Sequence, residues 1–133
     1  MKGDNTIDIQ VINPKKAPSP IGAYSQVIIS EKLVFISGQI AINPETNQFI
    51  DGTVEEQLEQ VLKNIETMLY ESNSQFENIL KVNIYTTDLN KFPVINAIYG
   101  KRFNNYYPVR SCVEVSKLPL NAKIEIDVIA RIK

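Results

Sequence analysis

The stretch PVRSCVEV, residues 108–115, carries one of only three arginines in the chain. Successive side chains of a β-strand point to opposite faces, so the residues of this stretch divide into two sets. One set is largely apolar and comprises Val109, Ser111, Val113 and Val115. The other set is polar or reactive and comprises Arg110, Cys112 and Glu114. The stretch therefore predicts a strand whose valines face the core and whose opposite face carries a permanently charged guanidinium.

Four more segments have the composition and alternation of strands: residues 26–30, 33–42, 80–86 and 123–132. The first two are separated by two residues and predict a hairpin. In the last segment, Glu125 and Asp127 alternate with isoleucines. Gly38 interrupts the second segment, and an isolated glycine in a strand indicates either a bulge or close approach of a ligand to the backbone. The pattern alone leaves both possibilities open.

Two segments have the spacing of helices. Residues 53–72 place apolar side chains three and four positions apart, and Thr53 with Glu56 forms a capping box that fixes the helix start. A second helix is predicted from about residue 91 to 103, with a core stripe of Phe92, Ile95, Tyr99 and Phe103. Asn96 lies beside this stripe, where it is either a satisfied structural amide or a functional group.

The order of these elements predicts an α+β fold in which two helices pack on one face of a mixed sheet. If the helices cover the apolar face, the open face carries Arg110, Cys112, Glu114, Glu125 and Asp127. Because charged and apolar residues mix on that face, it suits a subunit interface, and we expect a homo-oligomer. A structural alternative is that Arg110 and Glu125 simply form a cross-strand ion pair.

Composition excludes several classes of function. The chain has 133 residues, a formal net charge of −1 and no cluster of basic residues, which argues against a nucleic-acid partner. No apolar run is long enough to cross a membrane and the N-terminus lacks the apolar core of a signal peptide, so we expect a cytoplasmic protein with no membrane partner. The absence of histidine excludes a Ser-His-Asp triad, a Cys-His pair and a histidine-based metal site.

Five motifs then carry a resemblance to a known family: PSPIGAYSQ (18–26), ISGQIAINPETN (36–47), DLNKFPVINAIYGKRF (88–103), YPVRSCVEVSKLP (107–119) and KIEIDVIARI (123–132). In this order and spacing they resemble the RidA/YjgF family of reactive-intermediate deaminases, formerly grouped with endoribonuclease-like proteins and translation inhibitors. The resemblance covers a single domain from residue 14 to 133. Residues 1–13 are interpreted as an extended lead-in.

The resemblance implies a chorismate-mutase-like fold, a homotrimer with clefts between its subunits, and hydrolysis of 2-imino acids made by pyridoxal-phosphate-dependent dehydratases. The activity implied is that of a 2-iminobutanoate/2-iminopropanoate deaminase, which releases 2-keto acids and ammonia. The family's catalytic positions fall on Arg110 and Glu125. Its substrate-binding positions fall on Tyr24, Ser37, Gly38, Asn96 and Cys112, the last through its backbone carbonyl.

The chemistry of these residues fits that reaction. A guanidinium can hold the planar carboxylate of a 2-imino acid through two parallel hydrogen bonds. Glu125 and the Cys112 carbonyl would then orient water and the departing nitrogen, while the Cys112 thiol serves as a small apolar filler. Free imines already hydrolyse in water, so we expect neither a metal nor an organic cofactor.

Two other functions are compatible with parts of the pattern. In a non-catalytic module that senses 2-keto acids, Arg110 would have the same role, but a second anion at Glu125 would add nothing to carboxylate binding. An endoribonuclease or translation inhibitor is disfavoured by the few arginines and by the absence of histidine for acid-base cleavage.

Overall fold

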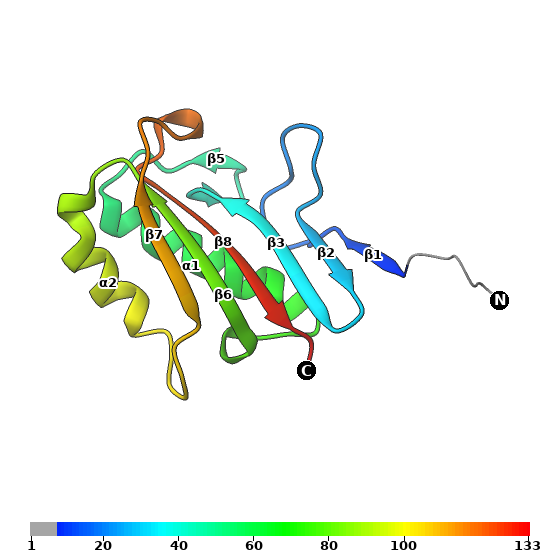
Figure 1. The fold of residues 1–133 in the computed structure, drawn as a ribbon. Coiled ribbons are helices and arrows are strands. Elements are labelled where there is room, and N and C mark those ends of the chain that lie inside the picture. The colour runs from blue at the N-terminus through cyan, green and yellow to red at the C-terminus, as the bar shows by residue number, and fades with distance from the viewer. Residues whose placement is uncertain (1–7) are drawn as a thin grey trace.

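The computed structural model describes residues 8–133, and its centre is one six-stranded sheet (Figure 1). Across the sheet the strand order is β1-β2-β3-β8-β6-β7, and only the β6–β7 pair is parallel. The strands are β1 (Ile9–Ile12), β2 (Val27–Ser30), β3 (Leu33–Gln39), β6 (Ile79–Thr86), β7 (Val109–Glu114) and β8 (Ile124–Arg131). A separate short hairpin is formed by β4 (Ile42–Asn43) and β5 (Gln48–Phe49).

Two helices, α1 (Val54–Glu71) and α2 (Phe92–Gly100), cover the same face of the sheet (Figure 1). The start of α1 is fixed as the sequence predicts: the Glu56 N–H donates to Thr53 Oγ1 at 3.1 Å, and the Thr53 N–H donates to Glu56 Oε1 at 2.8 Å. Three single-turn 3₁₀ helices lie in the connections, at Phe76–Asn78, Leu89–Lys91 and Pro119–Asn121. The predicted α+β layout, with both helices on one face of a mixed sheet, is confirmed.

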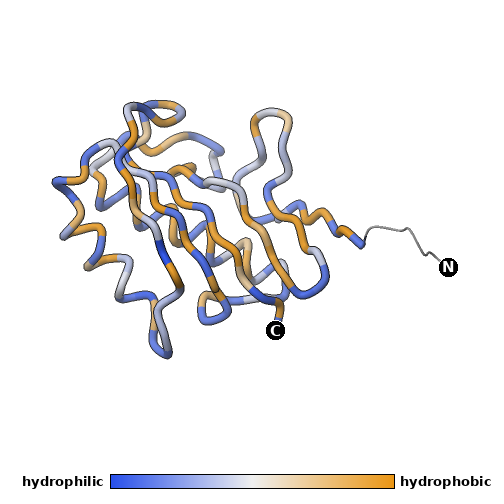
Figure 2. The backbone as a smooth tube through the Cα atoms, in the orientation of Figure 1, coloured by the Kyte–Doolittle hydropathy of each residue, from blue (hydrophilic) through white to orange (hydrophobic). Residues whose placement is uncertain are grey.

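The core lies between α1 and the helix-facing side chains of the strands. Buried apolar residues recur at every second position of the strands, and Figure 2 shows this alternation along the tube. The core side of β8 comprises Ile124, Ile126, Val128 and Ala130. From α1 the core receives Leu58, Val61, Leu62, Ile65, Met68 and Leu69.

One predicted orientation is wrong, and it concerns the stretch that carries Arg110. Strand register pairs Val82 with both Arg110 of β7 and Val128 of β8, and Val82 is buried under the helices. Arg110 therefore points to the helix side. Val109 and Val113 point to the open face and are 67% and 43% exposed. The physical reason is that β7 is an edge strand, so its alternating valines mark a face without requiring that this face be the core.

The N-terminal segment also contains more structure than the sequence indicates. Residues 9–12 of the predicted lead-in form β1, an edge strand that pairs antiparallel with β2. The first seven residues of that lead-in lie outside the described residues. Strand β6 begins with a register shift between Ile79 and Lys81, and Leu80 at this shift is 37% exposed.

Candidate active site

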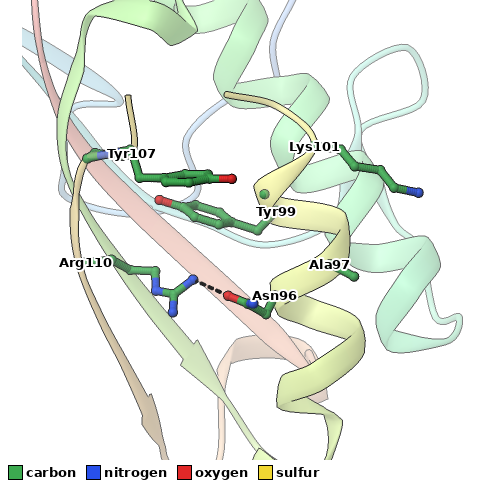
Figure 3. A pocket seen from close by; sticks show the side chains of 8 residues that line it. Asn96, Ala97, Tyr99, Lys101, Tyr107 and Arg110 are labelled. Atoms are coloured by element: carbon green, nitrogen blue, oxygen red, sulfur yellow. Dashed lines mark hydrogen bonds between the residues drawn. The ribbon is translucent and has the colours of Figure 1, made fainter. Parts of the chain in front are cut away.

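Arg110 lies in a polar and aromatic niche between β7 and α2 (Figure 3). Its Nη1 donates to Asn96 Oδ1 at 2.8 Å, so Asn96 orients the guanidinium. The guanidinium carbon lies 5.4 Å from the ring centre of Phe92 and 5.1 Å from that of Tyr99, within the range of cation–π contact. Among residues 8–133, no carboxylate lies within ion-pair distance of Arg110. The charge is therefore oriented but not neutralised, which suits an anionic ligand.

The niche opens into a cleft of about 680 Å³ between the end of α2 and the segment that enters β7. Its lining comprises Asn96, Ala97, Tyr99, Gly100, Lys101, Tyr107, Pro108 and Arg110. In Figure 3 the rings of Tyr99 and Tyr107 lie above the guanidinium, whereas Lys101 extends away from it. Burial raises the pKa of Tyr99 to about 12, so this phenol stays neutral beside Arg110 at ordinary pH. Arg110 is the cation that this cleft offers to a ligand.

A second cleft, of about 500 Å³, forms around the bulge in β3. The register between β3 and β8 shifts between Ile36 and Gln39, so the predicted bulge at Gly38 is confirmed. An added Cβ at Gly38 would lie 2.9 Å from Cδ of Glu125 and 3.2 Å from its Cγ. Only glycine leaves room for the carboxylate in the position that it occupies, so the bulge and Glu125 lie in direct contact.

Glu125 lies in an environment that disfavours its charge. It comes from β8 and is partly buried, and burial followed by the nearby charge of Asp127 raises the pKa of its carboxyl group. Asp127 is held by the Asn83 side-chain amide, which donates to its Oδ1 at 2.9 Å. A carboxyl group with a raised pKa in a cleft is a candidate for proton transfer.

Two predicted binding residues line the same cleft. Tyr24 is 47% exposed, and its hydroxyl oxygen accepts the Ile21 N–H at 3.3 Å, which leaves the hydroxyl proton for another acceptor. Ser37 precedes Gly38 in the bulge, and its Oγ donates to Gln26 Oε1 at 3.3 Å. The structure therefore gathers Tyr24, Ser37, Gly38 and Glu125 at one place.

A pair of buried glutamines supports this cleft and was missed in the sequence. Gln26 and Gln39 are 3% and 4% exposed, and Gln39 Nε2 donates to Gln26 Oε1 at 2.8 Å. Gln26 Nε2 in turn donates to the Pro18 carbonyl at 2.6 Å. The two amides tie the loop that carries Tyr24 to the bulge that carries Gly38. The only signal in the sequence was the presence of uncharged amides beside apolar strand residues.

The two clefts lie on opposite faces of the sheet. Tyr85 pairs with Glu125 on β8 and with Val113 on β7, which places Glu125 on the open face with Val113. Arg110 points to the helix face, and strand β6 separates β7 from β8. The cross-strand ion pair between Arg110 and Glu125 is therefore wrong, as is the placement of both on one open face. The predicted site residues of one chain form two half-sites.

The remaining residues of β7 have mainly structural surroundings. Cys112 is half-buried against the core on the helix side, and burial raises the pKa of its thiol, so the side chain is not an activated nucleophile. Glu114 Oε1 accepts the Leu89 N–H at 2.8 Å, so this carboxylate holds the turn that precedes α2. Both residues lie on an edge strand, whose outer backbone groups pair with no strand within residues 8–133.

Comparison with known proteins decides the family. The sequence profile described as Endoribonuclease L-PSP matches residues 14–132. The chain belongs to the RidA/YjgF family. It is 43% identical over 126 residues to the chloroplastic Reactive Intermediate Deaminase A of Arabidopsis thaliana, a match that covers 95% of this chain and 67% of that protein. The mitochondrial protein MMF1 of Saccharomyces cerevisiae is 41% identical over 90% of this chain and 81% of its own length.

The fold agrees with that of a solved family member. The crystal structure of RidA from a Psychrobacter species superposes with a TM-score of 0.88 at 35% identity and covers 92% of this chain and 98% of that one. No helix within residues 8–133 has the length and apolarity that crossing a membrane requires. The profile match over residues 14–132 and the similarity to the Psychrobacter structure confirm the RidA/YjgF resemblance of the five motifs.

Proposed function

We propose that the protein is a hydrolytic deaminase that converts 2-imino acids, and the enamines from which they tautomerise, to 2-keto acids and ammonia. The observation that carries this proposal is the pairing of chemistries in the two half-sites. One presents an oriented, unneutralised guanidinium at Arg110, and the other presents a carboxyl group of raised pKa at Glu125 over a glycine bulge. A carboxylate-bearing imine needs the first for binding and the second for proton transfer.

The two half-sites are completed by assembly of the chain. Because Arg110 and Glu125 lie on opposite faces of one sheet, a single substrate meets both only if they come from different subunits. The open face carries exposed apolar side chains beside the polar cluster around Glu125, including Leu33, Phe35, Val109 and Val113. Burial of this face between subunits of a homotrimer would place the Arg110 half of one subunit against the Glu125 half of the next.

Within such a cleft each group has a definite task. Arg110 holds the substrate carboxylate through its N–H groups that do not contact Asn96. Glu125 takes a proton from a water molecule as the water oxygen bonds to C2 of the imine, and it passes this proton to the imine nitrogen, which gives a carbinolamine. Glu125 then takes the proton of the new hydroxyl and delivers it to the amino nitrogen as the C2–N bond breaks, so that the C2 carbonyl forms and ammonia leaves. The Cys112 carbonyl would accept an N–H of that nitrogen, and Tyr24 would donate to the ligand.

Catalysis of this reaction requires little more than the positioning of substrate and water. Imines hydrolyse in water, so a few kcal/mol of barrier reduction is enough, and holding water and substrate together can supply about that amount. No resident cofactor enters these steps. A related structure, that of E. coli TdcF, is described as having bound serine; it is 34% identical, with a TM-score of 0.86 over 93% of this chain and 99% of that one. Serine, like a 2-imino acid, carries the carboxylate group that we propose Arg110 to bind.

The cellular setting also belongs to the proposal. We expect the substrates to come from pyridoxal-phosphate-dependent dehydratases in the cytoplasm, although two relatives are described as mitochondrial and chloroplastic. No membrane or nucleic-acid partner is required.

The test couples a threonine dehydratase to this protein and follows 2-ketobutyrate release while semicarbazide traps the free imine. The wild type is expected to divert imine from semicarbazide to keto acid, and Arg110→Ala and Glu125→Ala, checked for folding and assembly, are expected to abolish this effect. If the wild type binds 2-ketobutyrate through Arg110 but gives no acceleration, the chain is a sensing module. If it cleaves RNA instead, the endoribonuclease alternative holds.

A further inference from the structure

The turn at Pro119–Asn121 holds an apolar side chain in an unfavourable backbone conformation. Leu120 has φ 57° and ψ 25°, in the left-handed region, and Asn121 follows with φ 58°. Asparagine tolerates this region, whereas leucine is disfavoured there because its Cβ crowds the backbone. Leu120 is also 58% exposed, so it gains little from packing within the chain. Packing within residues 8–133 therefore does not compensate for leucine at this position.

The turn is nevertheless firmly fixed. The Asn121 N–H donates to the Leu118 carbonyl at 3.2 Å, and the Ala122 N–H donates to the Pro119 carbonyl at 3.0 Å. Ala122 is 1% exposed, and the next residue, Lys123, donates its N–H to Gln57 Oε1 of α1 at 2.9 Å. Because these anchors fix the backbone on both sides, the Leu120 side chain has a defined direction rather than that of a loose loop.

That direction is towards the Glu125 half-site. Leu120 lines the same cleft as Gly38 and Glu125, together with the aliphatic side chains of Ile21 and Ile40. Exposed apolar residues that line a cleft beside a carboxyl group of raised pKa form a surface for the apolar part of a ligand. When Arg110 of another subunit holds the substrate carboxylate and Glu125 acts at C2, the substrate side chain can extend along this wall, which lies beside Glu125 in the same cleft.

We propose that Leu120 is a specificity-determining residue that contacts the substrate side chain and favours 2-imino acids whose aliphatic side chains have two or more carbons. This inference rests on the proposed function and deepens it by naming the substrate class. Iminobutanoate and longer aliphatic analogues are preferred over iminopropanoate, whose single methyl group reaches the wall least. Charged side chains are disfavoured because the wall offers them no partner.

The experiment compares substrates with wild type and three variants. An L-amino acid oxidase generates imines from L-alanine and L-norvaline, and keto-acid release in competition with semicarbazide gives kcat/KM for each. Leu120→Gly and Leu120→Asn both suit the left-handed backbone and remove the apolar chain, and Leu120→Met retains an apolar chain. We expect the norvaline-to-alanine ratio to fall about tenfold in the Gly and Asn variants and to be kept in the Met variant, since the loss of one methylene contact with the wall contributes about that factor. The melting temperature of Leu120→Gly should equal or exceed that of wild type.

The outcomes separate this inference from the proposed function. A wild type without imine hydrolysis removes both. An active wild type whose ratio is unchanged in Leu120→Gly overturns the role of Leu120 alone. A Leu120→Gly variant that loses its assembly, or that loses activity equally on both substrates, shows Leu120 to be an interface or structural residue and also overturns the inference.

Discussion

Substitution of Gly38 by alanine probes the contact between the β3 bulge and Glu125. The added Cβ would lie 2.9 Å from Glu125 Cδ and 3.2 Å from its Cγ, closer than carbon atoms normally approach. Gly38 does not have a positive φ, so alanine meets no backbone obstacle there. The carboxyl group must therefore retreat by about 1 Å, and a misplacement of that size lowers the rate of a positioned reaction by about 100-fold.

A double-mutant cycle separates the steric effect from any other. Gly38→Ala alone is expected to lower the free energy of unfolding by less than about 1 kcal/mol, because the crowded atoms are the end of a flexible side chain that can move aside. In a Glu125→Ala background the same substitution should cost nearly nothing, which gives a coupling energy of similar size. Urea unfolding measures stability, and the dehydratase-coupled assay measures activity. If Gly38→Ala keeps full activity, or is equally destabilising in both backgrounds, Glu125 is not what requires glycine at this position.

Three further predictions follow from the surroundings of the two half-sites. Burial and the charge of Asp127 raise the pKa of Glu125, so in a pH–rate profile the rate should fall as the pH decreases through a pKa above the usual 4.5 of a glutamate. Asp127→Asn should move this acidic limb of the profile to lower pH. Gln26→Ala removes the acceptor of two buried or partly buried donors and should cost about 1–3 kcal/mol in urea unfolding; an unchanged unfolding curve would contradict the bracing role. Asn96→Ala removes the hydrogen bond that orients the Arg110 guanidinium, and calorimetry should show that 2-ketobutyrate binds about tenfold more weakly. Unchanged affinity would contradict the orienting role of Asn96.

The elements with strong local signals were predictable. The capping box at Thr53 and the apolar stripe that follows it identify α1. The glycine inside an apolar run left either a bulge or a close ligand approach open at Gly38, and the structure shows the bulge. These features depend on neighbours in sequence, where periodicity and propensity act directly. The site residues were predicted from motifs, and the structure places Tyr24, Ser37, Gly38 and Glu125 around one cleft.

The orientation of β7 was not predictable because it depends on tertiary pairing. Alternation shows that Arg110 and Val109 face opposite sides, but it does not show which side the helices cover. Parallel pairing with β6 places Arg110 opposite buried Val82, and α2 supplies Asn96 and two rings to receive it. Amphipathic alternation on an edge strand is equally compatible with a core face and with a face that is covered on assembly.

The two buried glutamines that support the second cleft could not be predicted from local sequence patterns either. Gln26 and Gln39 are polar residues beside strands and suggest solvent exposure, yet they are buried because each supplies the partner of the other. Strand β1 could not be predicted for a different reason. It is too short to show a periodic pattern, and it forms by pairing with β2.

Complementation between two inactive variants shows directly whether Arg110 of one subunit and Glu125 of another act on the same substrate. Arg110→Ala and Glu125→Ala subunits are each expected to be inactive; unfolding and refolding them together in equal amounts forms mixed assemblies. An interface is then complete only if it combines an intact Arg110 with an intact Glu125. Random mixing in a cyclic assembly makes about a quarter of the interfaces complete. About a quarter of wild-type keto-acid release is therefore expected to return. No recovery from mixed assemblies of normal size would show that the site is not shared between subunits.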